Sequence, residues 1–252
     1  MMAEEKMELI VVSDLDGTLL DHHDYSFAEV LPVLDRMDEA GIPLVVNTSK
    51  TRAEWLGMRD KFGNANAFIV ENGSALYDGD EVTVYGTPRA EIFKVLAELK
   101  EDFKFTGYAD VELEQIMEWT GLDRISAFKS ADREFSEPLV WEDTPEKEDE
   151  FCEEIRKRGL QTLRGGRFLH VLGATDKGKP LSYFREQDYA IIALGDRPND
   201  LAMLDQADIG VIVASPDGYL LETDGEFIRT KETGPRGWAE AMTKILDHFN
   251  KP

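Results

Sequence analysis

The chain is poor in cysteine, in long apolar runs and in basic residues. Cys152 is the one cysteine among 252 residues, so no disulfide can form within the chain and a reducing compartment suits it. No stretch approaches the roughly 18 apolar residues of a membrane-spanning helix, and residues 1–8 lack the apolar run of a signal peptide. We therefore expect a cytoplasmic protein without a membrane segment.

The shortage of basic residues argues against two classes of partner. Lys and Arg number 28 against 51 Asp and Glu, which gives a formal net charge of −23 at pH 7. Such a chain repels the nucleic-acid backbone and anionic membrane surfaces, so we expect neither as a partner. The acidity itself indicates no function, because a solvated acidic surface is its usual meaning. Hydrophobic residues make up 42%, enough for the core of one large domain or two modest ones.

Internal repeats and Gly/Ser-rich linkers are also missing, and both ends of the chain alternate apolar strand patterns with helix patterns. This alternation predicts an α/β fold with a Rossmann-like core, a parallel sheet that carries helices on both faces. A hairpin with the turn Asp78-Gly79 extends it. The expected strands are 9–13, 43–48, 67–70, 190–194 and 209–213, and the expected helices are 27–40, 52–61, one from 179, 199–204 and 238–249.

The middle of the chain groups its elements differently. Thr144 followed by Pro145 predicts the start of a helix, and Gly165-Gly166 predict a hairpin turn because glycine tolerates positive φ. This grouping predicts a small α+β domain at residues 87–173, inserted into a core made of residues 1–86 and 174–252. The other elements expected in the insertion are helices at 88–99 and 111–120 and strands at 138–141, 161–164 and 167–172.

Paired carboxylates follow the first expected strand. The segment DLDGT, residues 14–18, stands at the strand end where ligands bind in open α/β sheets. Asp14 and Asp16 are two apart, which in a strand places both on one face, and such a pair calls for a cation. One alternative is a calcium loop, but it needs a preceding helix and a Glu where Tyr25 stands. The other is an ordinary turn rich in Asp and Gly.

Polar groups also follow other expected strands. The segment GDRPND, residues 195–200, follows an apolar strand and opens a helix, Thr48 ends another strand, and Lys177 follows the insertion. Taken singly, Thr48 is more often a helix cap and Lys177 a surface charge. Together with DLDGT they favour a phosphate site with Mg²⁺, because hard oxygen ligands select that ion.

These segments resemble the four motifs of the haloacid dehalogenase (HAD) superfamily: DLDGT, the threonine after PLVVN, the lysine of DKGK, and GDRPND. The resemblance implies a phosphatase that works through an aspartyl-phosphate. It makes Asp14 the nucleophile and Asp16 the general acid and base, and it makes Thr48 and Lys177 phosphate ligands. A covalent intermediate divides the high barrier of phosphate-monoester hydrolysis into two lower ones.

The same resemblance implies Mg²⁺ as the cofactor. Its ligands would be Asp14, Asp16 through the backbone carbonyl, and Asp196. Asn199 and Asp200 would support these ligands.

Two features narrow the resemblance within the superfamily. The position two residues after the nucleophile is occupied by Asp16. An Asp there is typical of phosphatases and phosphomutases, whereas transport ATPases carry Thr and dehalogenases lack the acid. Thr48 and Lys177 are 129 positions apart but Asp16 and Thr48 only 32, so the insertion comes late in the chain. A late α+β insertion, or cap, resembles sugar-phosphate phosphatases and disfavours phosphomutases with an early helical cap. A phosphomutase and a catalytically silent metabolite-binding module remain the alternatives.

Further segments resemble the mannosyl-3-phosphoglycerate phosphatase family over nearly the whole chain. This closer resemblance implies a small phosphorylated sugar-glycerate as substrate and mannosylglycerate as product. Relatives with overlapping motifs accept glucosyl-3-phosphoglycerate, so both sugars stay open. His22 and His23, in the first of these segments, either are solvated or shape the entrance. The segments are LDHHDY at 20–25, NTSKTR at 47–52, ENG at 71–73, FSEP at 135–138 and GRFLH at 166–170.

Substrate contacts are expected from the core and from the cap. Ser49 and Lys50, next to the phosphate-binding threonine, are the core candidates. A substrate with both a phosphate and a carboxylate needs cations, and a forked guanidinium suits a carboxylate. We therefore expect Arg167 and His170 to contact the substrate and Glu137 to accept hydrogen bonds from sugar hydroxyls. The alternative is a solvated hairpin that only keeps the protein soluble.

Overall fold

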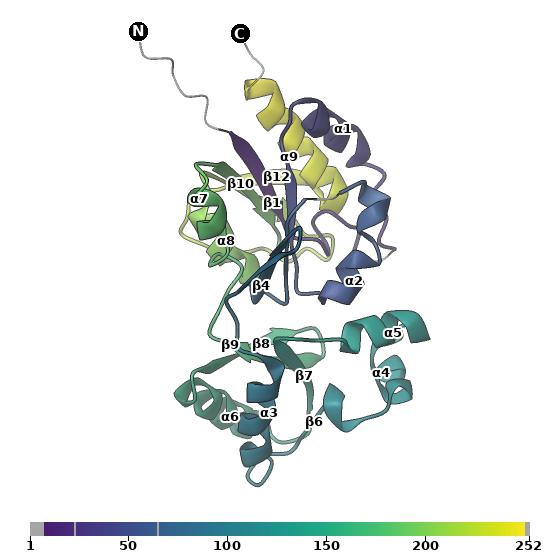
Figure 1. The fold of residues 1–252 in the computed structure, drawn as a ribbon, viewed down its shortest axis with the longest axis vertical. Coiled ribbons are helices and arrows are strands. Elements are labelled where there is room, and N and C mark those ends of the chain that lie inside the picture. Colours follow the sequence, from purple (N-terminus) through teal and green to yellow (C-terminus); the bar gives the residue numbers. More distant parts are fainter. Residues whose placement is uncertain (1–7, 23, 65, 250–252) are drawn as a thin grey trace.

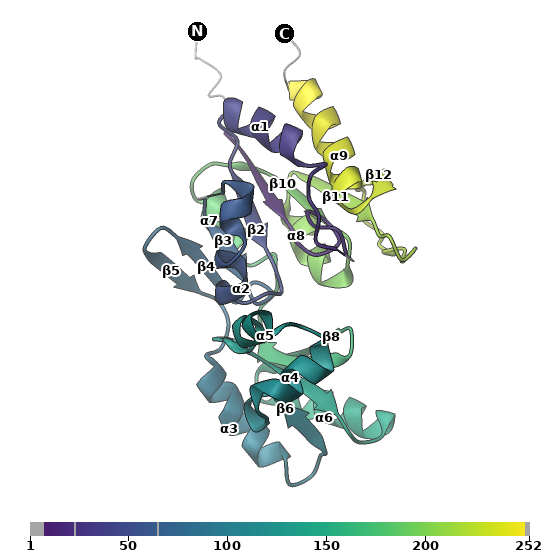
Figure 2. The same ribbon diagram turned by 90° about the vertical axis from the view of Figure 1, so that its right-hand side faces the viewer.

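The structure is a computed structural model that describes residues 8–22, 24–64 and 66–249. The ribbon forms two lobes, each built on its own β-sheet (Figure 1). The middle of the chain forms the smaller lobe, and the segments before and after it form the larger one (Figure 2).

The larger lobe contains an eight-stranded sheet in the order β12-β11-β10-β1-β2-β3-β4-β5. Strands from β12 to β3 pair in parallel, whereas β3-β4 and β4-β5 are antiparallel. The predicted Rossmann-like α/β core is thus confirmed. The strands are β1 (Leu9–Ser13), β2 (Leu44–Asn47), β3 (Phe68–Val70), β4 (Ala75–Asp78), β5 (Glu81–Val84), β10 (Ala190–Gly195), β11 (Ile209–Ala214) and β12 (Ile228–Thr233).

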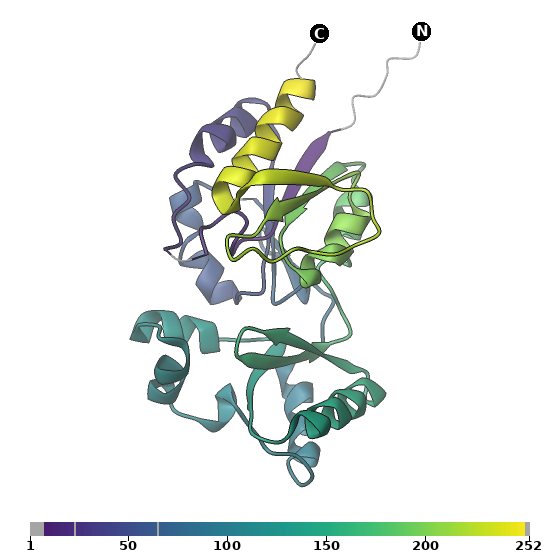
Figure 3. The same cartoon turned by 180° about the vertical axis from the view of Figure 1, so that it is seen from behind.

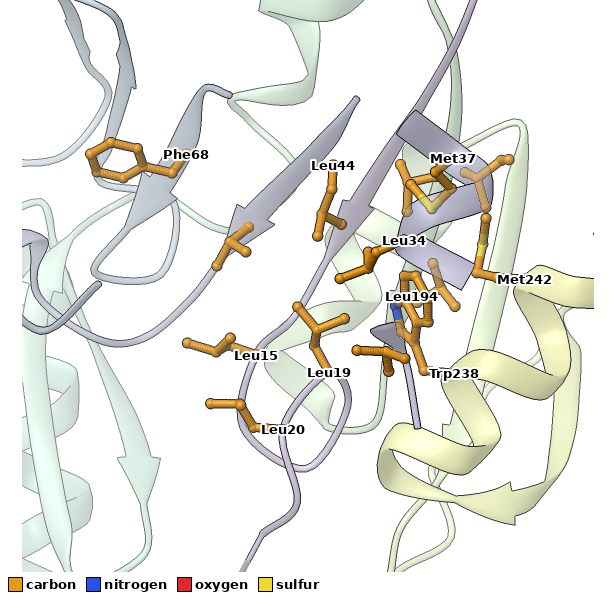
Figure 4. Packing of buried hydrophobic residues seen from close by; sticks show 14 of the residues in the cluster. Leu15, Leu19, Leu20, Leu34, Met37, Leu44, Phe68, Leu194, Trp238 and Met242 are labelled. Atoms are coloured by element: carbon orange, nitrogen blue, oxygen red, sulfur yellow. The ribbon is translucent and has the colours of Figure 1, made fainter. Parts of the chain in front are cut away.

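Helices cover both faces of this sheet. Successive strand residues point to opposite sides, and the side chains on both sides are apolar and pack against helices. On β1, Val11 packs in one apolar layer and Val12 in the other. Figure 4 shows the first layer, in which Trp238 lies near Leu34 and Leu194. The helices of this layer are α1 (Leu31–Glu39), α2 (Arg52–Leu56) and α9 (Gly234–Phe249), and those of the other are α7 (Leu181–Arg185) and α8 (Leu201–Gln206).

The smaller lobe contains a four-stranded antiparallel sheet in the order β6-β7-β9-β8. Leu139 and Leu169 are paired on neighbouring strands and pack against helices α3 and α6. The opposite face of the sheet is turned toward the larger lobe (Figures 1 and 3). The elements are β6 (Phe105–Gly107), β7 (Ser136–Trp141), β8 (Leu160–Gly165), β9 (Phe168–Gly173), α3 (Arg89–Leu99), α4 (Leu113–Thr120), α5 (Arg124–Ala131) and α6 (Pro145–Lys157).

The chain crosses between the lobes twice, after β5 and after β9, and the two crossings lie side by side. A Cβ atom built on Gly173 would overlap the backbone nitrogen of Thr87. The proposed domain boundaries, 1–86 with 174–252 for the core and 87–173 for the cap, fall at these crossings.

Both hairpin turns lie one residue later than predicted. Asp78 and Gly165 are still paired as the last residues of their strands, so each turn consists of the next two residues. The first turn residue, Gly79 or Gly166, has φ of +58° or +56°. The prediction of a turn at Gly165-Gly166 was therefore wrong by one position, and Arg167 is itself a turn residue.

Other differences concern helix ends and weak elements. The helix expected at 52–61 stops at Leu56 and continues after Gly57 as a 3₁₀-helix, η1 (Arg59–Phe62). The helix expected from residue 27 begins at Leu31, where Pro32 occupies its first turn. Strands β6 and β12 and helix α5 were not predicted, because they are short or largely polar.

In the part of the chain that the structure describes, we find no helix long and apolar enough to cross a membrane.

Candidate active site

Three of the predicted site residues follow strands of the parallel part of the larger sheet. Asp14 comes after β1, Thr48 after β2 and Asp196 after β10. The carboxyl ends of parallel strands lie at one edge of a sheet, so the three side chains gather there. That edge faces the smaller lobe, because β1 runs toward it (Figure 1).

Lys177 is fully buried among the acidic groups. Its Nζ lies 2.5 Å from Oδ1 of Asp14 and 2.7 Å from Oδ1 of Asp200. Asn47 donates its side-chain amide to the carbonyl oxygen of Lys177 at 2.7 Å, which holds this loop against the end of β2. Carboxylate oxygens of Asp14, Asp196 and Asp200 lie within 4.8 Å of one another. Three carboxylates around one ammonium leave an excess of negative charge.

Burial and mutual repulsion decide the titration of this cluster. Burial raises the pKa of Asp14 well above its ordinary value, against the opposing charge of Lys177. Burial, followed by the charge of Asp200, raises the pKa of Asp196 to about 6. Burial lowers the pKa of Lys177, but the carboxylates of Asp14 and Asp200 outweigh it and the net shift is upward. A divalent cation would relieve this repulsion, and carboxylate oxygens are its preferred ligands, so these residues fit Mg²⁺.

Asp196 is held by groups from several loops. Oδ1 accepts a hydrogen bond from the Thr18 hydroxyl at 3.1 Å, and Oδ2 accepts one from the Ser215 hydroxyl at 3.3 Å. Arg197 Nε lies 3.1 Å from Oδ2. Gly17 has φ of +84°, and a Cβ atom there would stand 3.1 Å from the same oxygen. Glycine is therefore required in DLDGT both for its backbone angle and for the close approach of Asp196.

Asp200 and Asn199 hold the loop after β10 in place. Oδ2 of Asp200 accepts hydrogen bonds from the backbone nitrogens of Asp196 at 3.0 Å and Arg197 at 2.9 Å. The side-chain amide of Asn199 donates to Oδ1 of Asn72 at 3.0 Å. Both side chains thus support the loop that carries Asp196.

Asp16 and Lys50 lie at the mouth of the site. The side chain of Asp16 is 30% exposed, and its Oδ1 lies 3.1 Å from Nζ of Lys50. Burial lowers the pKa of Lys50, but the charge of Asp16 and other acidic neighbours raises it overall. Thr48 is buried and its hydroxyl accepts a hydrogen bond from the backbone nitrogen of Lys50 at 3.1 Å. Ser49, between them in the sequence, is half-buried, and substrate contacts by Ser49 and Lys50 stay a prediction.

Glu137 does not reach the site in this structure. It is 1% exposed and lies on the side of the cap sheet that α3 covers. Its Oε2 accepts a hydrogen bond from Arg89 Nε at 2.7 Å, and its Oε1 accepts one from the backbone nitrogen of Ala109 at 2.8 Å. The carboxylate predicted to accept sugar hydroxyls is therefore bound inside the cap.

The predicted cap contacts His170 and Arg167 differ in burial. His170 pairs with Pro138 of β7, and its Nδ1 is buried without a hydrogen-bond partner among the described residues. Burial, with a smaller effect of the Arg133 charge, lowers its pKa to about 3. Arg167 is exposed at the hairpin turn and donates to the carbonyl oxygen of Trp119.

The histidines of the first loop are placed only in part. His22 is exposed, and His23 lies outside the described residues. A role for either at the entrance stays a prediction.

Sequence reasoning missed two charged groups between the lobes. The carboxylate of Glu71 accepts hydrogen bonds from the backbone nitrogens of Glu134 at 2.8 Å and Phe135 at 3.2 Å, and from the Ser136 hydroxyl at 2.5 Å. Arg133 donates to the same hydroxyl at 2.8 Å. The signal in the sequence was their position, because Glu71 belongs to ENG and Arg133 stands two residues before FSEP.

Known proteins match the chain over most of its length. Residues 11–165 match the family described as haloacid dehalogenase-like hydrolase. The glucosyl-3-phosphoglycerate/mannosyl-3-phosphoglycerate phosphatase of Persephonella marina is 34% identical over an alignment of 268 positions, which spans 96% of this chain and 99% of that protein.

Solved structures share the fold. Protein 0175 of Thermoplasma acidophilum has a TM-score of 0.70 at 18% identity, over 96% of this chain and 98% of its own. BT1666 from Bacteroides thetaiotaomicron, a phosphatase of the haloalkanoate (HAD) superfamily, has a TM-score of 0.70 at 23% identity. The match covers 99% of this chain and 97% of BT1666. BT4131, a sugar phosphatase of HAD subclass IIB, has a TM-score of 0.69 at 17% identity. The match covers 94% of this chain and 98% of BT4131. At these identities the likeness shows the fold alone.

Proposed function

The chain belongs to the haloacid dehalogenase-like hydrolases, and on this premise we propose that it is a Mg²⁺-dependent phosphatase of a glycosyl-3-phosphoglycerate. The observation that carries the proposal is the buried Lys177, which bridges Asp14 and Asp200 beside Asp196. The expected enzyme class, a phosphoric monoester hydrolase, agrees with both the family and the relative from Persephonella marina.

In the first step, a carboxylate oxygen of Asp14 forms a bond to phosphorus while the bond from phosphorus to the ester oxygen breaks. Asp16 gives its proton to the departing alkoxide. Asp16 suits this role because its partly exposed carboxyl group lies at the mouth of the site, where the leaving group emerges.

In the second step, water attacks the phosphorus of the aspartyl-phosphate and Asp16 takes the water's proton. The bond from phosphorus to Asp14 breaks, so inorganic phosphate leaves and the Asp14 carboxylate is restored. Lys177 and Thr48 hold the phosphoryl oxygens during both steps.

A bound Mg²⁺ supplies further positive charge that stabilises the phosphoryl oxygens. Asp14 and Asp196, with the backbone carbonyl of Asp16, would hold it. Asp200 keeps Lys177 in position through one oxygen and the Asp196 loop through the other.

The substrate is proposed from the resemblance and the named relative. The Persephonella marina phosphatase carries both glucosyl- and mannosyl-3-phosphoglycerate in its name. We propose mannosyl-3-phosphoglycerate as the substrate here, with mannosylglycerate, a compatible solute, and phosphate as products. Glucosyl-3-phosphoglycerate is the alternative at the same site.

The test is phosphate release from both glycosyl-3-phosphoglycerates and from a generic aryl phosphate, with Mg²⁺ and with excess chelator. We expect release only with Mg²⁺ and the highest kcat/KM for one of the glycosyl-3-phosphoglycerates. A phosphomutase would return a phosphorylated isomer in place of free phosphate, and a silent binding module would release none. Full activity in excess chelator would reject the proposal.

A further inference from the structure

Arg133 is a buried cation between the two lobes that the proposed mechanism does not use. Its side chain is 8% exposed, and Nη1 donates to the Ser136 hydroxyl at 2.8 Å. Its Nε is buried without a hydrogen-bond partner among the described residues. A guanidinium carries five N–H donors, so Arg133 retains donors for a further acceptor.

The ion pair that Arg133 forms with Glu71 does not use its spare hydrogen-bond donors. The nearest distance from Nη1 to Oε2 of Glu71 is 3.8 Å, which is longer than a hydrogen bond. The Glu71 carboxylate already accepts from two backbone nitrogens and from the Ser136 hydroxyl. Glu71 is thus satisfied without the spare donors of Arg133.

A second unpaired group stands on the same face of the cap sheet. Ser136 and Pro138 are two apart on β7 and share a face, and His170 is paired with Pro138. This face is turned toward the larger lobe, opposite the face on which α3 and α6 pack (Figure 1). Nδ1 of His170 is buried and unpaired among the described residues. Arg133 is close enough for its charge to act on His170.

The geometry points to an anion subsite formed by Arg133 and His170, which binds a carboxylate on the alcohol that the phosphatase releases. A guanidinium fork matches a carboxylate in two parallel hydrogen bonds, and a neutral imidazole can add a third N–H. In a chain of net charge −23, an arginine with spare donors at the face above the catalytic edge is suited to an anionic leaving group. This inference rests on the proposed phosphatase function and replaces the exposed Arg167 as the main carboxylate ligand.

The test compares two small substrates, 3-phosphoglycerate and glycerol 3-phosphate, which differ by a carboxylate in place of a hydroxymethyl group. The wild-type protein should prefer 3-phosphoglycerate by kcat/KM. Arg133→Met should lower the ratio of the two kcat/KM values by about 30-fold or more, because a charged hydrogen bond at a buried site is lost. Arg133→Lys, which keeps the charge near Glu71 but loses the fork, should lower the ratio less.

Arg164→Met is the matched control in the same cap. Arg164 lies on strand β8 and pairs with Glu148 of α6, so its loss should leave the ratio as in the wild type. The inference is overturned if wild type shows no preference for 3-phosphoglycerate, or if a folded Arg133→Met or Arg133→Lys protein keeps a ratio within threefold of wild type. If Arg133→Met does not fold, the Arg133→Lys ratio decides. Absence of Mg²⁺-dependent aryl-phosphate hydrolysis in the wild type would instead refute the proposed function.

Discussion

At the scale of single residues, the main feature of the site is a group of charged side chains that are buried close to one another. Asp14, Asp196 and Asp200 share one small volume with Lys177, and their oxygens lie within 4.8 Å of one another. Burial raises the pKa of both Asp14 and Asp196, so each gains from a cation nearby. In the proposed mechanism, Lys177 would bind the same phosphoryl group that Asp14 attacks.

Replacement of the proposed nucleophile, Asp14, tests the proposed covalent mechanism. Asp14→Asn should lower kcat for aryl-phosphate hydrolysis by at least about a thousandfold, because an amide is a poor nucleophile toward phosphorus. The measurement is steady-state phosphate release with Mg²⁺, alongside thermal unfolding to show that the variant is folded. Turnover near the wild-type rate would contradict an aspartyl-phosphate on Asp14.

Replacement of Asp16 tests its proposed role as the general acid. Asp16→Asn should lower kcat more for sugar or glycerate esters than for aryl phosphates, because an alkoxide needs a proton to leave and a phenolate does not. The measurement compares, for this one variant, the loss of kcat on a sugar or glycerate ester with the loss of kcat on an aryl phosphate. Equal losses on both substrate classes would argue against proton donation by Asp16.

The lowered pKa of His170 predicts that folding stability depends on pH. Its pKa is about 3 in the folded protein, through burial and the charge of Arg133, against an ordinary value of 6.5. Between these values the unfolded chain binds a proton that the folded protein does not, so stability is full above pH 6.5 and falls toward pH 3. The loss at pH 5 should be about 2 kcal/mol.

The check is urea unfolding at pH 7 and pH 5 for wild type and for His170→Gln, which keeps a polar side chain that cannot titrate. The variant should lose less stability than wild type between these pH values. Other titrating groups act on both proteins alike, so the difference isolates His170. An identical loss in both would contradict a neutral imidazole at His170 in the folded protein.

At the scale of elements, a turn with positive φ after β3 contacts both the smaller lobe and the loop after β10. Glu71, Asn72 and Gly73 have φ of +48°, +58° and +83°. Glu71 binds the segment at the start of β7, and Asn72 binds Asn199 of the loop after β10. Non-glycine residues in this conformation cost about 1–3 kcal/mol each, which the contacts of the turn offset.

Gly73→Ala tests the third position of this turn. A Cβ atom on Gly73 would overlap the backbone carbonyl of Asp176, next to Lys177, so the loop that carries the lysine must move. We expect stability to fall by about 3 kcal/mol and kcat/KM for aryl phosphate to fall with it. Gly79→Ala is the matched control, because Gly79 has φ of +58° with nothing within 4 Å of its Cβ position. The control should cost about 1 kcal/mol and leave activity unchanged. Equal effects of the two substitutions would show that the contact with the lysine loop is unimportant.

At the scale of the whole molecule, the charge of −23 and the acidic cluster both favour bound cations. Mg²⁺ that binds only the folded protein should raise the free energy of unfolding, by about 2.7 kcal/mol at a hundredfold excess over Kd. Thermal unfolding with Mg²⁺ should be compared with NaCl at equal ionic strength, since salt also screens the general repulsion. The extra stabilisation by Mg²⁺ should disappear in Asp196→Ala. A Mg²⁺ effect no larger than that of NaCl would contradict a specific site.

The apolar strands of the fold and the motif residues of the candidate site could be predicted from the sequence. Strands β1 and β10 are continuous apolar runs, which require burial on both faces wherever they pack. The polar strand β12 was missed because its segment, IRTKET, is mostly exposed at the sheet edge and lacks such a run. The hairpin turns were misplaced by one residue, because glycine-containing turns can form in either of two neighbouring registers.

By itself, the sequence determined which chemistry the protein carries, because the reactive groups stand in short contiguous motifs directly after apolar strands. Only the tertiary structure decided which cap side chains face the core. Glu137 and Ser136 are neighbours on β7, yet one is bound inside the cap and the other lies with Arg133 between the lobes. Side chains alternate along a strand, and the choice of the inner face depends on where α3 and α6 pack, which is a property of distant segments.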